Sequence, residues 1–318
     1  VTGATGFVGS HVVRELAGAG HEIVGVDIHE PDDAVRHYLR DVTARVRFVQ
    51  ADISTPGAVP GAVNAALDAT VHMAVITSTP EFELAHPDRV VDVNVVGTVE
   101  VLRASRRLGA GRFIYVSSSG VYGDTDPEVV LSETHPLQLG TLYTMTKFAS
   151  ERLVAAERAS GGLMAASVRI AAPYGPMERP TGARTLMSPL YALVRAARDR
   201  RAISIAHPNA GRDWTHASDI GLGIRTLLEA PAWDHECYNL SSGHRVSFGE
   251  VADILTALAP GFTWRRMSDG PVDIDGAQAH RRGPLDISRL RRLGFAPRYA
   301  IREGLQDTLH WLRETRLP

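Results

Sequence analysis

The sequence predicts an α/β protein with a Rossmann-type doubly wound parallel sheet and a smaller C-terminal α/β substrate lobe. Short runs of β-branched residues alternate with helical patterns through residues 1–170, which is typical of βαβ crossovers. A glycine-rich turn opens the first helical pattern, and an acidic residue ends the strand after it, as in dinucleotide-binding folds. The length of 318 residues suits one large domain or two lobes that share a core.

Local patterns predict each element of the N-terminal half. Strands are expected where β-branched and apolar residues form short runs, at 21–27, 46–51, 69–74, 112–117 and 165–170. Helices are expected where apolar residues recur at helical spacing, at 9–19, 90–108 and 142–159. No strand precedes the glycine-rich turn. Either residues before Val1 were trimmed, or the assignment of the turn is wrong.

The composition changes after residue 170. Residues 172–184 are rich in Pro and Gly and are expected to form a loop. Helices are expected at 188–198, 219–228, 248–258 and 301–313, and strands at 200–206 and 237–240. Ser247 precedes the third of these helices and Glu250 follows it by three residues, which predicts a capping box.

Composition excludes several classes of function. The chain has 34 Lys and Arg against 36 Asp and Glu, a net charge of −2, so no basic footprint for nucleic acid or an anionic membrane is expected. No apolar run reaches the ~18–20 residues of a membrane span. Cys237 is the single cysteine, which favours a reducing, cytoplasmic compartment. The histidines lack metal-ligand spacing, so no metal is expected.

The glycine-rich turn predicts a dinucleotide site. Gly3, Gly6 and Gly9 are three residues apart, which lets the backbone turn tightly, approach a pyrophosphate and press a helix against the sheet. The helix N-terminus then offers N–H groups to the anion. Asp27 ends the next strand, where an acid binds ribose hydroxyls and repels a 2′-phosphate. The Asp27 carboxylate therefore favours NAD over NADP. The alternative interpretation of the glycine-rich segment is a turn with a purely structural role.

A tyrosine and the only lysine of the chain predict the chemistry. Lys147 follows Tyr143 by four residues, so within a helix the two side chains share a face. A free tyrosine titrates near pH ~10, but a nearby ammonium lowers its pKa. The serines at 117–119 follow a strand at the edge of the sheet where ligands bind. We expect one of them to bond the substrate oxygen whose proton Tyr143 removes; the alternatives are an accidental pair and a serine-rich turn.

Together these residues resemble the extended short-chain dehydrogenase/reductase family, in its NAD-dependent epimerase/dehydratase branch. The resemblance runs over essentially the whole chain. It implies that Ser118, Tyr143 and Lys147 are catalytic, with Ser119 as the competitor for the serine role. Besides Tyr143 and Lys147, it implies an NAD-binding set that consists of Gly3, Gly6, Phe7, Val8, Gly9, Asp27, Ile28, Asp52, Ile53, Met73, Ala74, Asn94, Val116, Ile170 and Pro173.

The resemblance also implies a substrate site. Besides Ser118 and Tyr143, that site is expected to contain Thr77, Ser119, Ala172, Arg179, Arg184, Arg212 and Arg281. Arg212 and either Arg281 or Arg282 stand where the resemblance places diphosphate-binding arginines, a role that suits guanidinium; the alternative is surface charge. Dehydratases of this family carry an acidic pair after the catalytic hydroxyl, where this chain has Ser119 and Gly120. Ala172 stands where members that handle nucleotide sugars often have Asn.

The expected function is that of an NAD-dependent sugar or nucleotide-sugar epimerase. One alternative is an NAD-dependent dehydrogenase of a free acidic sugar, and another is a non-catalytic NAD-sensing protein on the same fold. Residues 1–170 are expected to bind NAD, with 212–233 returning to that domain, and 171–318 to bind the substrate. By analogy with the family, the helices at 90–108 and 142–159 should pair in a homodimer; a monomer in light scattering would contradict this.

Overall fold

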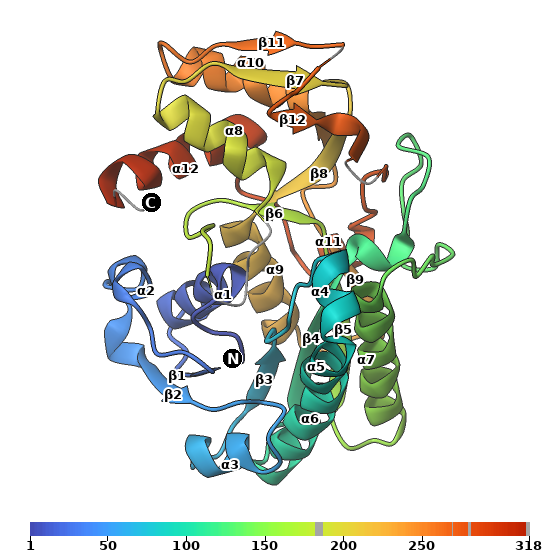
Figure 1. Ribbon diagram of the computed structural model, residues 1–318. Helices are drawn as coiled ribbons and strands as arrows, with labels where there is room; N and C mark the ends of the chain where they lie inside the picture. Colours follow the sequence, from blue (N-terminus) through green and yellow to red (C-terminus); the bar gives the residue numbers. More distant parts are fainter. Residues whose placement is uncertain (182–186, 269, 279–280, 316–318) are drawn as a thin grey trace.

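A parallel sheet forms the lower half of the molecule in Figure 1. The computed structural model describes residues 1–181, 187–268, 270–278 and 281–315. In spatial order, the strands of the sheet are β2 (Val46–Gln50), β1 (Ile23–Asp27), β3 (Ala69–His72), β4 (Arg112–Ser118), β5 (Met164–Ile170) and β9 (Cys237–Leu240). Thr2 bridges Val26 of β1 and His72 of β3 in parallel, which joins the two groups of strands. The order is doubly wound, and the predicted fold class is confirmed.

The first residues of the chain take the strand position before the glycine-rich turn. The Val26 N–H donates to the Val1 carbonyl at 2.8 Å, and the Thr2 N–H donates to the Val71 carbonyl at 3.0 Å. The Gly3 N–H donates to the Val26 carbonyl at 2.9 Å. The turn therefore leaves the carboxyl edge of the sheet between β1 and β3, as the dinucleotide-binding interpretation requires.

Helices cover both faces of this sheet. On one face α1 (Phe7–Gly18) packs against α9 (Ala217–Glu229), and on the other α6 (Gly97–Arg107) packs against α7 (Leu142–Ala159). Along β4, Ile114 belongs to the core with α1 and α9, whereas Phe113 belongs to the core with α6 and α7. A strand buried on both faces has a nearly continuous apolar sequence, which explains why these strands were predictable.

A smaller lobe lies above the carboxyl edge of the sheet in Figure 1. One three-stranded sheet contains β6 (Ala172–Tyr174), β8 (Gly211–His216) and β10 (Arg245–Ser247), and another contains β7 (Ile203–Ala206), β11 (Trp264–Arg266) and β12 (Ile274–Asp275). The helices of this lobe are α8 (Pro189–Arg198), α10 (Phe248–Leu258) and α12 (Ile301–Thr315). Apolar side chains of both lobes belong to one core cluster, so the lobes share a core.

Short elements are where the structure departs from the prediction. The expected helix at 90–108 is divided into α5 (Pro87–Val91), a π-helical turn (Asp92–Val96) and α6. Residues 172–174 form β6 instead of loop because they pair with β8, a strand that the sequence did not predict. Unpredicted helices are α2 (Asp33–Tyr38), α3 (Ala58–Val63), α4 (Pro80–Ala85) and α11 (Ser288–Arg292). Helices this short depend on tertiary packing.

Two elements from the C-terminal half of the chain belong to the main sheet and its helical cover. Both α9 and β9 follow residue 170 in the chain, yet α9 packs on α1 and β9 pairs with β5.

The predicted capping box is confirmed, since the Ser247 hydroxyl accepts from the Glu250 N–H and the Glu250 carboxylate accepts from the Ser247 N–H. Within the described ranges, no helix has both the length and the apolar character needed to cross a membrane.

Candidate active site

One large cavity opens at the carboxyl edge of the main sheet and has a volume of about 1610 Å³. The glycine-rich turn, the ends of β1, β3, β4 and β5, the start of α7 and the loop into β6 all line it. Pockets for one small ligand usually measure ~300–1,000 Å³. The cavity therefore has room for a dinucleotide and a second ligand side by side.

The glycine-rich turn forms one end of the cavity, and its backbone leaves no room for a side chain at Gly3 or Gly9. Gly3 has a φ of +68°, which favours glycine. A Cβ atom on Gly9 would lie 1.9 Å from the Gly3 carbonyl oxygen. Helix α1 starts directly after Gly6, which provides no side-chain cap. This arrangement leaves helix N-terminal N–H groups for a phosphate, so the turn fits the pyrophosphate of a dinucleotide.

Two carboxylates line the same end of the cavity. Asp27 accepts hydrogen bonds from the Thr5 N–H at 3.0 Å and the His29 N–H at 3.3 Å. The glycine-rich turn thus holds the acid that is predicted to bind ribose hydroxyls. Asp52 pairs with Arg89 at 3.0 Å and accepts from the Ser54 hydroxyl at 2.6 Å. Both acids have fixed orientations at the position expected for the adenosine half of NAD.

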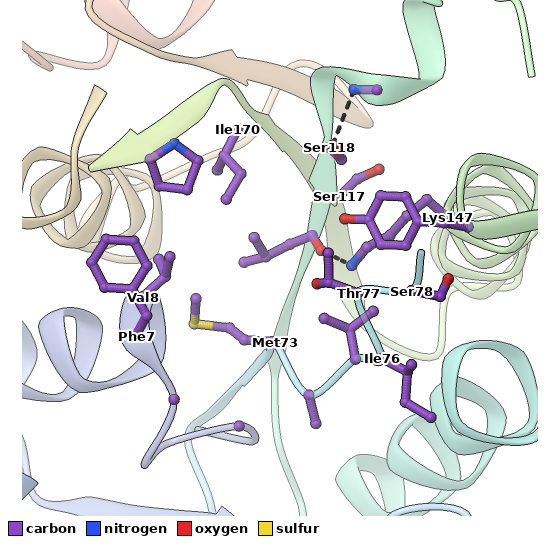
Figure 2. A pocket seen from close by; sticks show the side chains of 18 of the residues that line it. Phe7, Val8, Met73, Ile76, Thr77, Ser78, Ser117, Ser118, Lys147 and Ile170 are labelled. Atoms are coloured by element: carbon purple, nitrogen blue, oxygen red, sulfur yellow. Dashed lines mark hydrogen bonds between the residues drawn. The ribbon is translucent and has the colours of Figure 1, made fainter. Parts of the chain in front are cut away.

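The three predicted catalytic side chains line one wall of this cavity. Figure 2 shows Ser118 at the end of β4 and the Lys147 side chain extending toward β4 from α7, across the cavity from Phe7 and Val8. The Lys147 ammonium donates to the Val116 carbonyl at 2.8 Å and lies 5.8 Å from the centre of the Tyr143 ring. The Ser118 hydroxyl oxygen accepts from the Gly120 N–H at 3.0 Å. A serine that accepts one bond can still donate its proton to a substrate oxygen.

Lys147 has an unusual electrostatic environment. Its side chain is buried, with 3% of the residue exposed. Burial lowers the pKa of the Lys147 ammonium to about 7, and Glu151, one turn later on α7, acts in the opposite direction. A lysine with a pKa near neutrality gains or loses its proton in response to small changes in the surrounding charges.

The contacts of the three neighbouring serines differ. The buried Ser117 hydroxyl donates to Glu151 at 2.6 Å. The Ser119 hydroxyl accepts from the Arg282 guanidinium at 3.3 Å. Among the described residues, the Ser118 hydroxyl bonds only its own turn, at Gly120, and Ser118 lines the cavity together with Tyr143. These contacts favour Ser118 over Ser119 for the catalytic role, which stays a prediction.

Glu83 is a site residue that the sequence analysis missed. Its carboxylate accepts from the N–H groups of Leu142 and Tyr143, both at 2.9 Å, and from the Ser78 hydroxyl at 2.8 Å. An acid at a helix N-terminus is favourable, and this one also ties the cavity wall at Ser78 to the start of α7. Glu83 and Tyr143 are 60 residues apart, so no local sequence signal could have connected them.

Two half-buried arginines, Arg212 and Arg282, line the opposite end of the cavity. The Arg212 Nε has no hydrogen-bond partner among the described residues, and burial lowers the pKa of this guanidinium. Burial also lowers the pKa of Arg282 to about 10, and the nearby Arg212 adds to this effect. The adjacent Asp213 carboxylate is engaged by the Leu285 N–H and the Ser242 hydroxyl. Two neighbouring desolvated cations form a site suited to a multiply charged anion.

Two of the predicted site residues that the structure describes, Arg281 and Asn94, do not line the cavity. Arg281 is exposed and does not line the cavity, whereas its neighbour Arg282 does. Asn94 is 2% exposed and bonds the Ile76 backbone and the Thr146 hydroxyl; it supports the wall from behind. Arg179 lines the cavity, but its guanidinium pairs with Asp32 at 2.5 Å. Arg184 lies outside the described residues.

All other predicted site residues line the cavity. Their convergence is a tertiary result, because they come from segments between residue 3 and residue 212. No cluster of three or more His, Cys, Asp or Glu side chains that could hold a metal ion occurs within the described ranges.

Comparison with known proteins agrees with this geometry. Residues 1–241 match the NAD dependent epimerase/dehydratase family. The chain is 24% identical to a putative UDP-glucose 4-epimerase of Methanocaldococcus jannaschii, over 98% of this chain and 97% of that protein. It is 30% identical to a dTDP-glucose 4,6-dehydratase of Actinoplanes sp., over 99% of this chain and 98% of that protein.

A solved structure shows the same fold over nearly the whole chain. It is the UDP-glucose-4-epimerase from Stenotrophomonas maltophila with bound NAD and formylated UDP-arabinopyranose. The TM-score is 0.82 and the identity 25%, with 99% of this chain and 97% of that chain covered. The resemblance inferred from the sequence is therefore confirmed at the level of family and fold.

Proposed function

Since the chain belongs to the NAD-dependent epimerase/dehydratase family, we propose that it is an epimerase whose substrate is a nucleotide sugar. The observation that carries the proposal is the single cavity that joins three features. The glycine-rich turn lies at one end, Ser118, Tyr143 and Lys147 line the middle, and Arg212 and Arg282 lie at the other end. We also propose that residues 1–170 with 212–233 hold the coenzyme and that the rest of 171–318, apart from β9 of the main sheet, supplies the substrate lobe.

The coenzyme end of the cavity fits NAD. The glycine-rich turn would hold the pyrophosphate against the N-terminus of α1, and Asp27 would bind the adenosine ribose. When bound, NAD accepts a hydride from a carbinol carbon and can return it. A second phosphate on that ribose would meet the Asp27 carboxylate, which supports NAD over NADP.

The side chains in the middle of the cavity would carry out the proton transfer. The Tyr143 phenolate takes the proton of the substrate hydroxyl and later returns it, while the Ser118 hydroxyl donates a hydrogen bond to the same oxygen. The Lys147 ammonium, 5.8 Å from the Tyr143 ring, favours the phenolate form. Glu83 holds the backbone of Tyr143 at the start of α7, which limits how far the phenol can move.

The arginine end of the cavity supports a nucleoside diphosphate group in the substrate. Guanidinium groups bind phosphate oxygens in bidentate geometry, and two of them match the two charges of a diphosphate. A free acidic sugar, the alternative, would present one carboxylate to both cations. Two relatives described above carry nucleotide sugars in their names, and the solved relative holds one.

Replacing Arg282 by methionine tests this assignment. We expect Arg282→Met to raise the KM for UDP-glucose about 10- to 100-fold, because a charge-assisted contact to phosphate contributes about 1.5–3 kcal/mol. The matched control is Arg281→Met, which removes an exposed arginine one residue away that does not line the cavity. Equal KM changes in the two variants would contradict a diphosphate contact from Arg282.

The residues after Ser118 favour an epimerase over a dehydratase. Elimination of water from a sugar requires an acid and a base next to the reacting carbons. The two positions that follow Ser118 are Ser119 and Gly120, which supply neither. The Glu83 carboxylate, also on the cavity wall, already accepts bonds from α7 and Ser78.

The fate of the coenzyme tests the proposed reaction. The purified protein is expected to retain NAD and to interconvert UDP-glucose or dTDP-glucose with an epimer without net accumulation of NADH. Products are separated by chromatography, and NADH is followed by absorbance. Stoichiometric NADH from a free acidic sugar with added NAD would instead support the dehydrogenase, and a dehydrated keto sugar would support the dehydratase.

Retained NAD with no turnover of any of these sugars would favour the non-catalytic alternative. The homodimer and the cytoplasmic location expected from the sequence stay predictions.

A further inference from the structure

A buried ion pair lies directly behind the catalytic wall. Glu151 of α7 accepts from Arg169 of β5 through both carboxylate oxygens, at 2.9 Å from Nε and 2.7 Å from Nη2. The Ser117 hydroxyl of β4 donates to the same carboxylate at 2.6 Å. All three side chains are buried. Glu151 therefore joins one helix and two strands at a single point.

This point lies close along the chain to two of the predicted catalytic residues, Ser118 and Lys147. Ser117 immediately precedes Ser118, and Glu151 follows Lys147 by one helical turn on the same face of α7. The Lys147 ammonium donates to the Val116 carbonyl, and the Glu151 carboxylate accepts from the Ser117 hydroxyl. Helix α7 is therefore hydrogen-bonded to two successive residues of β4. A shift of α7 along β4 would break both contacts and would change the separation of Tyr143 from Ser118.

We propose that Glu151, held by Arg169 and Ser117, is a positioning residue that keeps Tyr143 in register with Ser118 and keeps Lys147 in its ammonium form. The inference rests on the proposed function, since it concerns the same catalytic wall. Glu151 does not line the large cavity, so it acts through Lys147 and Ser117 and does not touch the substrate.

The groups around Lys147 make Glu151 the relevant charge. Tyr115 of β4 lies with its ring centre 4.9 Å from the Lys147 ammonium, and burial raises the pKa of its phenol, which keeps it neutral. Burial, with the nearby Lys147, lowers the pKa of His72 of β3 to about 3, so the imidazole is neutral too. Tyr143 and Glu151 share the helix of Lys147. Among these described neighbours of Lys147, Glu151 is the residue that carries a carboxylate.

The energetics of buried ion pairs also favour a functional role. Replacing such a pair by apolar residues of similar volume is often neutral or stabilising, so stability alone does not require charges at this position. Here the negative partner lies on the helix of Lys147, and the positive partner approaches from β5. The pair thus places its negative end one helical turn from Lys147, where it acts on the ammonium through the electric field.

The sign of the pH effect follows from these contacts. Burial lowers the pKa of Lys147 to about 7, and Glu151 raises it against that effect. Without the carboxylate, the pKa of Lys147 falls further and the ammonium is lost at lower pH. As the pH is raised, the activity, which needs the ammonium, therefore begins to fall at a lower pH in the variant than in the parent. We expect the alkaline limb of the pH–rate profile of Glu151→Gln to move down by about one unit, the size typical of a single nearby charge.

The experiment compares Glu151→Gln with Glu157→Gln in the NAD-loaded enzyme. Glu157 is on the same helix, is also buried, and pairs with Arg106 at 2.6 Å, but it lies ten residues beyond Lys147. Only Glu151→Gln should shift the alkaline limb of the pH profile of kcat. It should also lower kcat by a larger factor than it changes the KM for UDP-glucose. We expect both variants to retain NAD. An unshifted limb in folded Glu151→Gln, or the same shift in both variants, would overturn the inference.

Two further variants cover the case in which an unpaired Arg169 prevents folding. The double variant Glu151→Gln with Arg169→Gln removes both charges and should also shift the limb downward, by less than the single variant because no unpaired cation remains; a wild-type limb would overturn the electrostatic part. Ser117→Ala keeps both charges and should lower kcat about fivefold, the worth of one hydrogen bond, without moving the limb. A wild-type kcat there would overturn the positioning part. Full activity of Tyr143→Phe would instead refute the proposed function itself.

Discussion

Replacing Tyr143 by phenylalanine is expected to lower kcat by about 10²–10⁴, the usual contribution of a positioned acid–base group. The variant keeps the ring and loses only the hydroxyl that takes the substrate proton. The backbone contact of Tyr143 to Glu83 and the Lys147 contact to Val116 do not involve that hydroxyl. We therefore expect unchanged folding and retained NAD. Stopped-flow absorbance of the coenzyme and the NAD content of the purified variant measure the two quantities.

A matched control removes a tyrosine hydroxyl elsewhere. Tyr191 on α8 accepts a hydrogen bond from Arg195 and does not line the cavity. Tyr191→Phe should keep kcat within about twofold of the parent, because this buried tyrosine lies outside the cavity and loss of its bond from Arg195 affects stability rather than the reaction. Comparable losses of kcat in both variants would mean that Tyr143 contributes structure and not proton transfer.

Replacing Gly9 by alanine is expected to weaken NAD binding by about 100-fold or more. The new Cβ would lie 1.9 Å from the Gly3 carbonyl oxygen, far inside van der Waals contact, so the backbone of the turn must shift. Overpacking of this kind costs about 1–3 kcal/mol and occasionally more, and 1.4 kcal/mol corresponds to tenfold in affinity. The displaced backbone is the part proposed to hold the pyrophosphate. NAD titration followed by fluorescence, together with the melting temperature, tests this.

Gly18 offers the control on the same helix. A Cβ at Gly18 would have no heavy atom within 4 Å, so alanine fits without displacement and suits a helix better than glycine. Gly18→Ala should bind NAD like the parent and melt at the same or a slightly higher temperature. Parental NAD affinity in Gly9→Ala would refute the role of the turn in coenzyme binding.

The coenzyme turn and the Tyr143–Lys147 pair were predictable because their geometry is local. Glycines spaced by three shape a turn whatever surrounds it, and residues four apart on a helix lie on one face. Asp27 follows from the same unit, since one strand and one helix place it beside the turn. Buried strands such as β4 were equally clear, because both of their faces are apolar.

Other parts of the site depend on long-range contacts. Arg281 and Arg282 are chemically identical neighbours, and only the fold places Arg282 on the cavity wall. Asn94 falls in a π-helical turn and points into the protein, toward Ile76 and Thr146. Glu83 meets Tyr143 from 60 residues away, and Glu151 of α7 bonds both Arg169 of β5 and Ser117 of β4. Side-chain direction in such cases is set by packing.

The amino-acid sequence by itself determined the family, the doubly wound fold, the coenzyme turn and the reactive tyrosine–lysine pair, because each depends on residues close together in the chain. The tertiary structure decided that Arg282 and not Arg281 lines the cavity, that Ser117 and Ser119 bond side chains from other segments, and that Glu83 bonds the start of α7. Those choices depend on burial and on contacts between distant segments, where desolvation and hydrogen bonding set the energy of each charge.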